Sequence, residues 1–280
     1  WFIFIKYKKY KKKMSTTQII SVINQKGGVG KTTTVINLAA GLVLQNKKIL
    51  VIDLDPQGNA TTGLGMSNSE NSDETIYGVL NGRKKIDEVL KKTQFQNMEL
   101  VSSNVDLSGL ELETAGDNKR AFILKEQLTA YLNDFRDKYD YVLIDCPPSL
   151  SLLTVMALVT SHSLIVPLQT EFFALEGLTQ LMKTIDRIKI NLNPELKIEG
   201  ILLTMFDKRN KLSSQVEKEA RDYFKEKVYS TVIPRNVRLS EAPSHGVPVL
   251  IYDKSCPGSK SYFKFTDEFL SKKETFESAA

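Results

Sequence analysis

The chain has 280 residues, of which 41% are hydrophobic and 25% are charged, a composition typical of globular proteins and unlike that of disordered or collagen-like chains. This length lies near the upper limit for one hydrophobic core, so one large domain or two small ones are possible. The apolar runs are too short to form a membrane-spanning helix. Two cysteines and two histidines are too few for a disulfide framework or a four-thiolate zinc site, which makes a reducing, cytosolic setting the default.

The net charge of +5 is unevenly distributed along the chain. Residues 1–13, WFIFIKYKKYKKK, contain six lysines and no acidic residue, whereas the remainder carries 32 basic and 33 acidic residues. The overall basic balance therefore says nothing about what the remainder binds. An argument for nucleic-acid binding needs a local basic patch.

Residues 1–13 are apolar first and basic afterwards, which is the reverse of a secretory signal. Met14 follows the lysines and could be the natural start. Two interpretations stay open: translated upstream sequence, or a basic and aromatic arm that touches lipid headgroups or DNA. We expect this leader to lie outside the fold and residues 14–280 to form a single domain.

Short apolar runs alternate with helical patterns along the chain. The apolar runs predict buried strands at residues 19–23, 49–52, 98–101, 141–144, 164–166, 198–203 and 228–233. Apolar residues three and four apart predict helices at residues 33–45, 121–135, 175–188, 216–224 and 262–270, and residues 67–74 read as a polar loop. Such alternation predicts an α/β fold, doubly wound, with a mostly parallel sheet and helices on both faces.

A glycine-rich segment, QKGGVGKTT at residues 25–33, follows the first predicted strand and opens the first predicted helix. Glycines let backbone N–H groups curve around an anion, and the helix N-terminus adds the positive end of its dipole. Lys31 can reach the β- and γ-phosphates of a nucleotide, and the Thr32 hydroxyl can ligate Mg²⁺. The pattern predicts a phosphate-binding loop.

This loop departs from the strict pattern G-x-x-x-x-G-K-[ST], because Gln25 stands where the first glycine belongs. A second lysine, Lys26, lies at the loop entrance instead. A dinucleotide-binding loop is the weaker alternative, because the third glycine of G-x-G-x-x-G is missing.

Three acidic residues end or follow predicted strands: Asp53, Asp55 and Asp145. Ligands of a parallel sheet bind at the carboxyl ends of its strands, so we expect Asp53 and Asp55 to point toward the phosphate loop from the same side. A carboxylate there can orient or deprotonate a water molecule, or hold magnesium through a water. Asp145 closes the apolar run VLI, which is the Walker B form.

Four separated motifs, KGGVGKTTT, DLDPQGNATTGLG, DCPPSL and IPRNVRLSEAPSHG, resemble those of the ParA/Soj family of chromosome-partitioning ATPases. The resemblance runs from about residue 19 to residue 252. It implies a P-loop ATPase with a deviant Walker A loop that hydrolyses ATP to ADP and phosphate with Mg²⁺. It implies that the nucleotide is bound by Lys26, Gly27, Gly28, Val29, Gly30, Lys31, Thr32, Thr33, Pro234 and Asn236.

The resemblance also implies individual roles. Lys26 would reach across an ATP-sandwiched homodimer to the partner's phosphates, and Lys31 would neutralise the transferring phosphoryl group in its own chain. Asp55 would position the hydrolytic water. Thr32 would ligate Mg²⁺ with Asp145 nearby, acting through water.

The family resemblance further implies ATP-dependent, sequence-independent binding of double-stranded DNA, hydrolysis stimulated by a ParB-type centromere-binding protein, and a cytoplasmic, nucleoid-associated location. Residues 206–238 carry nine basic and five acidic residues within a nearly neutral body. By resemblance, Arg209 and Arg238 are the best candidates for contacts with DNA phosphates.

Two alternative functions remain. A MinD-like membrane-cycling ATPase would end in a basic amphipathic helix, but this chain ends in KKETFESAA, so no stable membrane anchor is expected. The aromatic residues Tyr262, Phe263, Phe265 and Phe269 fit a helix that packs on the body better. A DNA-coating scaffold without hydrolysis is disfavoured because Lys31, Asp55 and Asp145 are all present.

Overall fold

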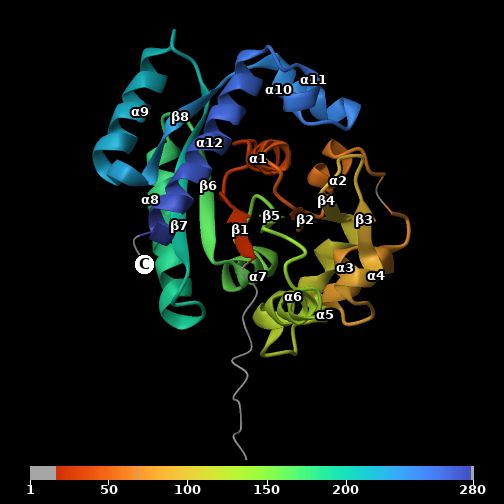
Figure 1. Ribbon diagram of the computed structural model, residues 1–280. Coiled ribbons are helices and arrows are strands. Elements are labelled where there is room, and N and C mark those ends of the chain that lie inside the picture. The colour runs from red at the N-terminus through yellow and green to blue at the C-terminus, as the bar shows by residue number, and fades with distance from the viewer. Residues whose placement is uncertain (1–16, 68, 279–280) are drawn as a thin grey trace, which may run out of the picture.

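The seven predicted strands and one further short strand, β3, form one eight-stranded sheet in the order β3-β4-β2-β5-β1-β6-β7-β8 (Figure 1). The computed structural model describes residues 17–67 and 69–278, so the predicted leader lies outside the described residues. Every strand pair is parallel except β3 with β4. The strands are β1 (Gln18–Val22), β2 (Ile49–Asp53), β3 (Leu90–Lys92), β4 (Met98–Val101), β5 (Tyr141–Asp145), β6 (Ser163–Gln169), β7 (Lys197–Phe206) and β8 (Val228–Pro234).

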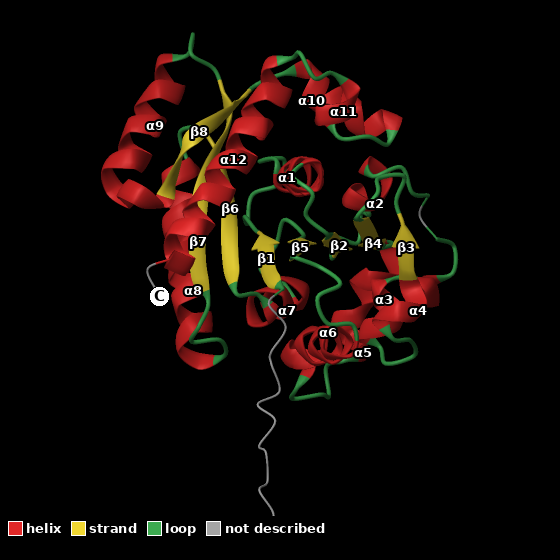
Figure 2. Cartoon of the chain, in the orientation of Figure 1, coloured by secondary structure: helices red, strands yellow, loops and turns green. Residues whose placement is uncertain are grey.

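Helices cover both faces of this sheet (Figure 2), which confirms the predicted doubly wound α/β fold. Helices α1, α11 and α12 pack on one face, and α3, α6, α7, α8 and α9 pack on the other. The helices are α1 (Lys31–Leu44), α2 (Asn59–Gly63), α3 (Ile76–Leu80), α4 (Ile86–Val89), α5 (Leu110–Glu113), α6 (Ile123–Asp134), α7 (Leu152–Thr160), α8 (Ala174–Asn191), α9 (Lys211–Phe224), α10 (Val237–Glu241), α11 (Val249–Tyr252) and α12 (Pro257–Ser278).

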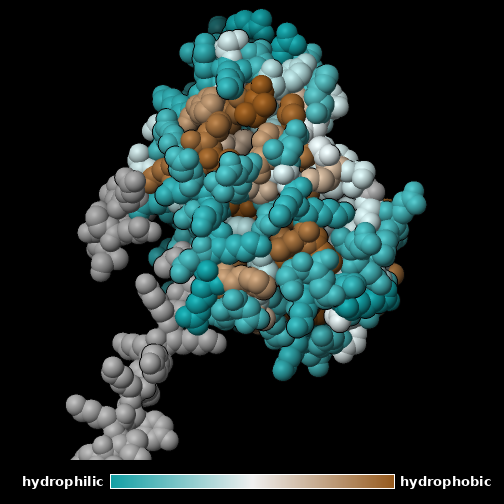
Figure 3. Space-filling model, turned by 45° about the vertical axis from the view of Figure 1, so that its right-hand side comes forward, coloured by the Kyte–Doolittle hydropathy of each residue, from teal (hydrophilic) through white to brown (hydrophobic). Residues whose placement is uncertain are grey.

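The central strands are apolar along their length because each of their faces is covered by helices. In β2, Ile49 and Val51 join the hydrophobic cluster beneath α1, whereas Leu50 and Ile52 join the cluster on the opposite face. By contrast, the outer surface is mostly hydrophilic, with separate hydrophobic patches on the face drawn in Figure 3. This distribution is that of a doubly covered sheet with a solvated exterior.

The structure adds elements that the periodicity did not predict. Strand β3 has three residues, two of them lysines, and it exists through its antiparallel pairing with β4 rather than through an apolar run. Helix α9 begins at Lys211, five residues before the predicted start, because the Asn210 side chain accepts a hydrogen bond from the Leu212 N–H and caps it. A 3₁₀ turn, Ser72–Glu74, interrupts the predicted polar loop.

The C-terminal helix α12 packs across β8 and α1, as the aromatic pattern indicated. Tyr262, Phe265 and Phe269 are buried, and the Phe265 ring meets the Tyr229 ring edge to face with centroids 4.8 Å apart. The carboxylate of Glu268 accepts hydrogen bonds from two backbone N–H groups of the edge strand β8, at Ser230 and Thr231. Within the described part of the chain, no helix is long and apolar enough to cross a membrane.

We expect Phe265→Ala to lower the free energy of unfolding by about 3–5 kcal/mol, because it removes a fully buried ring and leaves a cavity between α12 and β8. Urea denaturation followed by circular dichroism measures this loss. Lys264→Ala, one residue away and exposed, is the matched control and should leave the midpoint nearly unchanged. Equal midpoints for the two variants would show that α12 contributes little to the core.

Candidate active site

A cavity of about 490 Å³ opens at the carboxyl ends of the parallel strands. Its walls come from the glycine-rich loop after β1, the segment after β2 and the segment after β8. It brings together most of the predicted site residues, namely Gly27, Gly28, Gly30, Lys31, Thr32, Thr33, Asp55, Pro234 and Asn236. Of the others, Val29 and Asp145 are buried, and Lys26 points elsewhere.

The glycine-rich loop curves because two of its glycines adopt a backbone conformation that side chains disfavour. Gly28 and Gly30 have φ angles of 71° and 90°, and Gly30 is the N-cap of α1. Left-handed φ at both positions turns the chain between β1 and α1 without the strain that a Cβ atom would add. The loop therefore presents its backbone N–H groups and the N-terminus of α1 to the cavity.

Side chains from neighbouring strands hold this loop in place. The Thr204 hydroxyl of β7 donates a hydrogen bond to the Val29 carbonyl at 2.8 Å. The Asn24 amide donates to the Pro167 carbonyl of β6 at 2.7 Å, and its oxygen accepts the Lys26 N–H. The loop is thus anchored to β6 and β7 before any ligand arrives.

Lys31 places a buried ammonium at the floor of the cavity. Its Nζ donates a hydrogen bond to the Lys26 carbonyl at 3.1 Å. Burial lowers the pKa of Lys31, and the negative charges of Asp145 and Asp55 only partly oppose that effect. A bound phosphate would supply the counter-charge that this desolvated cation lacks.

Thr32 and Asp145 form the next contact in the site, because Thr32 Oγ1 donates to Asp145 Oδ2 at 2.7 Å. The second oxygen of the carboxylate, Oδ1, is buried without a hydrogen-bond partner among the described residues. Burial, and then the charge of neighbouring Asp53, raise the pKa of Asp145. A buried carboxylate oxygen with unused acceptor capacity, beside a hydroxyl, fits a bound cation.

Thr32 and Asp145 offer Mg²⁺ the kind of partial coordination that is usual in nucleotide sites. Magnesium binds through one or two protein oxygens and completes its shell with phosphate oxygens and water. Over residues 17–67 and 69–278, no cluster of three or more His, Cys, Asp or Glu side chains could hold a metal ion. Thr32 and Asp145 would therefore hold magnesium together with the nucleotide rather than alone.

Asp53 and Asp55 do not share one orientation, so the expectation that both face the phosphate loop holds for Asp55 alone. Asp53 is fully buried, and its Oδ2 accepts hydrogen bonds from the N–H and the hydroxyl of Thr61, both at 2.8 Å. Burial raises the pKa of Asp53 to about 6, although these hydrogen bonds lower it. Asp53 holds the α2 segment in place, whereas Asp55 lines the cavity.

Four further residues shape the site and were not singled out from the sequence: Asn24, Thr61, Glu171 and Thr204. Glu171 follows the carboxyl end of β6, and Thr204 lies near the end of β7. The argument that selected residues at the ends of β2 and β5 applies equally to these strands. Thr61 carries no such signal, because its role depends on how α2 folds back over β2.

The two arginines predicted to bind DNA lie at the same edge of the sheet as the cavity. Arg209 follows β7, and both its Nε and its Nη2 donate to the Asp207 carboxylate, at 3.0 and 2.9 Å. Arg238, on α10, donates to Glu241 at 2.7 Å. The Arg209 guanidinium lowers the pKa of Asp207 to about 2. Each arginine therefore has an intramolecular carboxylate partner.

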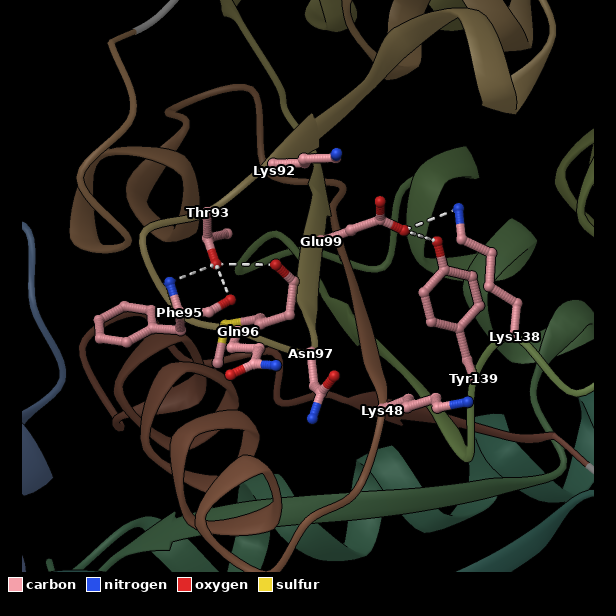
Figure 4. Close-up of a pocket in the computed structure, with 10 residues that line it drawn as sticks. Lys48, Lys92, Thr93, Phe95, Gln96, Asn97, Glu99, Lys138 and Tyr139 are labelled. Carbon is pink, nitrogen blue, oxygen red and sulfur yellow. Dashed lines mark hydrogen bonds and ion pairs between the residues drawn. The ribbon is translucent and has the colours of Figure 1, made fainter.

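A second cavity, of about 430 Å³, lies at the amino ends of β2 and β4 (Figure 4). Lys48, Lys92 and Lys138 border it, and Glu99 accepts hydrogen bonds from Lys138 and Tyr139. It contains none of the predicted site residues. The candidate active site is therefore the cavity at the opposite, carboxyl end of the sheet.

A glycine-rich turn from strand to helix, with its lysine and an acidic residue ending a neighbouring strand, defines a P-loop nucleotide-binding protein. Residues 17–198 match the family described as an AAA domain. The chain is 48% identical over 263 residues to the chromosome partitioning protein ParA of Caulobacter vibrioides, covering 94% of this chain and 97% of that protein. It is 46% identical to the sporulation initiation inhibitor protein Soj of Bacillus subtilis, covering 90% and 97%.

The chain belongs to the ParA/Soj family of chromosome-partitioning ATPases. A solved structure, cobyrinic acid a,c-diamide synthase of Mycobacterium smegmatis with bound ADP and magnesium, superimposes with a TM-score of 0.76. It is 34% identical and covers 90% of this chain and 93% of that one. The predicted fold class and the predicted family are both confirmed.

We expect Lys31→Ala to weaken ATP binding by about 10- to 100-fold, because a charge-assisted contact to phosphate contributes about 1.5–3 kcal/mol. Isothermal titration calorimetry measures the affinity. Lys48→Ala is the matched control, since Lys48 is an exposed lysine at the far end of the sheet. Unchanged affinity in Lys31→Ala would remove this lysine from the phosphate site.

Proposed function

We propose that the protein is an ATP-driven switch for DNA segregation. It binds ATP with Mg²⁺, dimerises around the nucleotide, binds DNA without sequence preference, and is reset by hydrolysis that a ParB-type partner stimulates. The observation that carries this proposal is the single cavity in which the phosphate loop, Asp55 and the Pro234–Asn236 segment meet. A switch of this kind would act in the cytoplasm, on the nucleoid.

In the proposed reaction, each residue acts on a different part of the nucleotide. The loop N–H groups and Lys31 bind the β- and γ-phosphates and offset charge that develops on the transferring group. Thr32 and Asp145 would hold Mg²⁺, which supplies further neutralisation of that charge. Pro234 and Asn236 also line the cavity and would contact the adenine.

Asp55 is the residue placed to act on water. One of its carboxylate oxygens, Oδ1, accepts the Gln57 N–H at 3.0 Å, and no described residue donates to the other. That second oxygen can accept a hydrogen bond from the attacking water and orient it toward the γ-phosphate. Asp55 would therefore control hydrolysis without controlling nucleotide affinity.

Dimerisation is supported by the surface beside the loop. Lys26 points out of its own cavity and is half exposed, and its ammonium pairs with Glu171 at this surface, so a second copy of the chain would reach it by displacing that carboxylate. Phe172 and Phe173, which follow Glu171, are 71% and 69% exposed and pack edge to face against each other. Exposed aromatic side chains are enriched at protein–protein interfaces.

We expect Asp55→Ala to retain ATP binding and to accumulate ATP-bound dimer, while hydrolysis falls by about 10²–10⁴-fold, the usual contribution of a positioned acid–base group. Phosphate release measures hydrolysis, and light scattering measures the dimer. The matched control is Asp186→Ala, an exposed aspartate of α8 that does not line the cavity. A variant that stays monomeric with ATP would contradict the assignment of Asp55.

DNA binding is proposed to use residues near Arg209 and Arg238. A guanidinium has five N–H donors, so an arginine that already pairs with a carboxylate can still donate to a phosphate. The Arg209 side chain is 90% exposed, which leaves room for this second contact. The basic patch of one chain would bind DNA weakly, whereas a dimer would present two patches and bind more tightly. Because ATP controls dimerisation in this proposal, DNA affinity would depend on the bound nucleotide.

We expect Arg209→Glu and Arg238→Glu to weaken DNA binding to the same extent for any DNA sequence, without changing ATP-dependent dimerisation. Affinity should fall with salt at a log–log slope of about −0.9 per phosphate contacted, and each reversal should flatten that slope by about 2 in a symmetric dimer. Fluorescence anisotropy across a salt series measures both quantities. Asp207→Asn should strengthen binding, because it frees Arg209 from its carboxylate partner.

The chain starting at Met14 is the right background for these measurements, because the six lysines of the leader could bind DNA themselves. Arg83→Glu is the matched control, since Arg83 also pairs with an aspartate, Asp73, but lies away from residues 206–238. If the reversals at Arg209 and Arg238 leave affinity and slope unchanged, the basic segment is only a solvated surface.

The packing of α12 disfavours the membrane-cycling alternative. The aromatic residues of α12 that could have entered a bilayer are packed instead, because Tyr262, Phe265 and Phe269 are buried against the body. An amphipathic membrane anchor needs its apolar face free. Sedimentation with anionic liposomes and with plasmid DNA separates the two functions.

A further inference from the structure

Lys26 and Glu171 form an ion pair at the mouth of the candidate site. Lys26 Nζ lies 2.6 Å from Glu171 Oε2, and the two side chains are 50% and 44% exposed. The residues are 145 positions apart in the sequence, and they meet because β6 lies beside β1 in the sheet. The lysine that is proposed to act on a second copy is therefore occupied within its own chain.

Both members of this pair are held in position. The Lys26 N–H donates to Asn24 Oδ1, and the Lys26 carbonyl accepts the Lys31 ammonium. On the other side, the Gln169 amide contacts the second carboxylate oxygen of Glu171, and the Glu171 N–H donates to the Gln169 carbonyl at 2.9 Å. The ion pair therefore joins two anchored segments: the backbone of Lys26 is held, and the Glu171 carboxylate is held by Gln169.

We propose that Glu171 is a positioning residue that sets the threshold for dimerisation by competing with nucleotide phosphate for Lys26. This inference rests on the proposed function, because it needs Lys26 to reach the phosphates of a second copy. The ammonium must leave the carboxylate to do so. A triphosphate carries more negative charge than a diphosphate, so it competes better for the same cation.

The Glu171 carboxylate also repels the nucleotide that the second copy brings to the interface. Once Lys26 has moved, Glu171 is left beside a phosphate without its counter-charge, and like charges at close range oppose each other. When two ADP-bound copies dock, the attraction between Lys26 and the diphosphate is too small to offset this repulsion. When two ATP-bound copies dock, the γ-phosphate adds attraction. Glu171 thus makes dimerisation selective for ATP.

The test is the variant Glu171→Gln, which removes the charge and keeps the size of the side chain. The chain is titrated with AMPPNP, which is not hydrolysed, and the dimer fraction is measured by sedimentation velocity. We expect the AMPPNP concentration at half-maximal dimerisation to fall by about two- to fivefold, the range for a half-exposed ion pair. With saturating ADP, the variant should also form more dimer than the wild-type chain.

Two further variants separate positioning from a structural role. Glu171→Asp keeps the charge on a shorter side chain, and its midpoint should lie between those of wild type and Glu171→Gln. Glu88→Gln removes an ion pair of similar exposure, with Lys84, far from the site, and should change nothing. The affinity of the monomer for nucleotide and the thermal midpoint should be unchanged in all of these variants.

The outcomes are distinct. If the wild-type chain dimerises with AMPPNP but Glu171→Gln has the same midpoint or a higher one, the inference is overturned while the proposed function stands; a higher midpoint would mean that Glu171 stabilises the dimer. If the wild-type chain stays monomeric with saturating AMPPNP, the proposed switch fails and the role of Glu171 fails with it.

Discussion

The candidate active site depends on two carboxylates that are buried side by side. Asp53 and Asp145 stand opposite each other in the parallel pairing of β2 with β5, and neither is exposed. Such a pair is unfavourable unless other groups compensate it. Thr61 does so for Asp53, and Thr32 does so for one oxygen of Asp145. The Oδ1 atom of Asp145 has no hydrogen-bond partner among the described residues. A cation that binds together with the nucleotide would compensate its charge.

The fold was largely predictable because most strands are apolar on both faces and most long helices show clear spacing. Strand β4 was predicted with the bounds that the structure gives, since three of its four residues, Met98, Leu100 and Val101, are apolar and buried. Strand β3 was not predictable, because nothing in Leu90–Lys92 indicates a strand until β4 lies beside it. The start of α9 depended on a side-chain cap that apolar spacing does not reveal.

The site was predictable where a motif encodes local geometry and not where it depends on tertiary contacts. The glycines and Lys31 lie together in sequence, so their cavity could be inferred from the loop alone. Asp53 and Asp55 differ in role because Thr61 folds back onto one of them, and sequence alternation cannot show this. The partner of Lys26 is likewise invisible in sequence, because Glu171 reaches it only through the pairing of β6 with β1.

The contact between Glu268 and β8 has a consequence for how copies of this chain can assemble. An open sheet can grow when a strand from another molecule pairs with its edge, which leads to filaments or aggregates. At one edge, Glu268 already occupies the N–H groups of Ser230 and Thr231. At the other edge, β3 is only three residues long and carries two lysines. Polymerisation through sheet extension is thereby disfavoured at both edges, which is compatible with the proposed association through the nucleotide-bearing face.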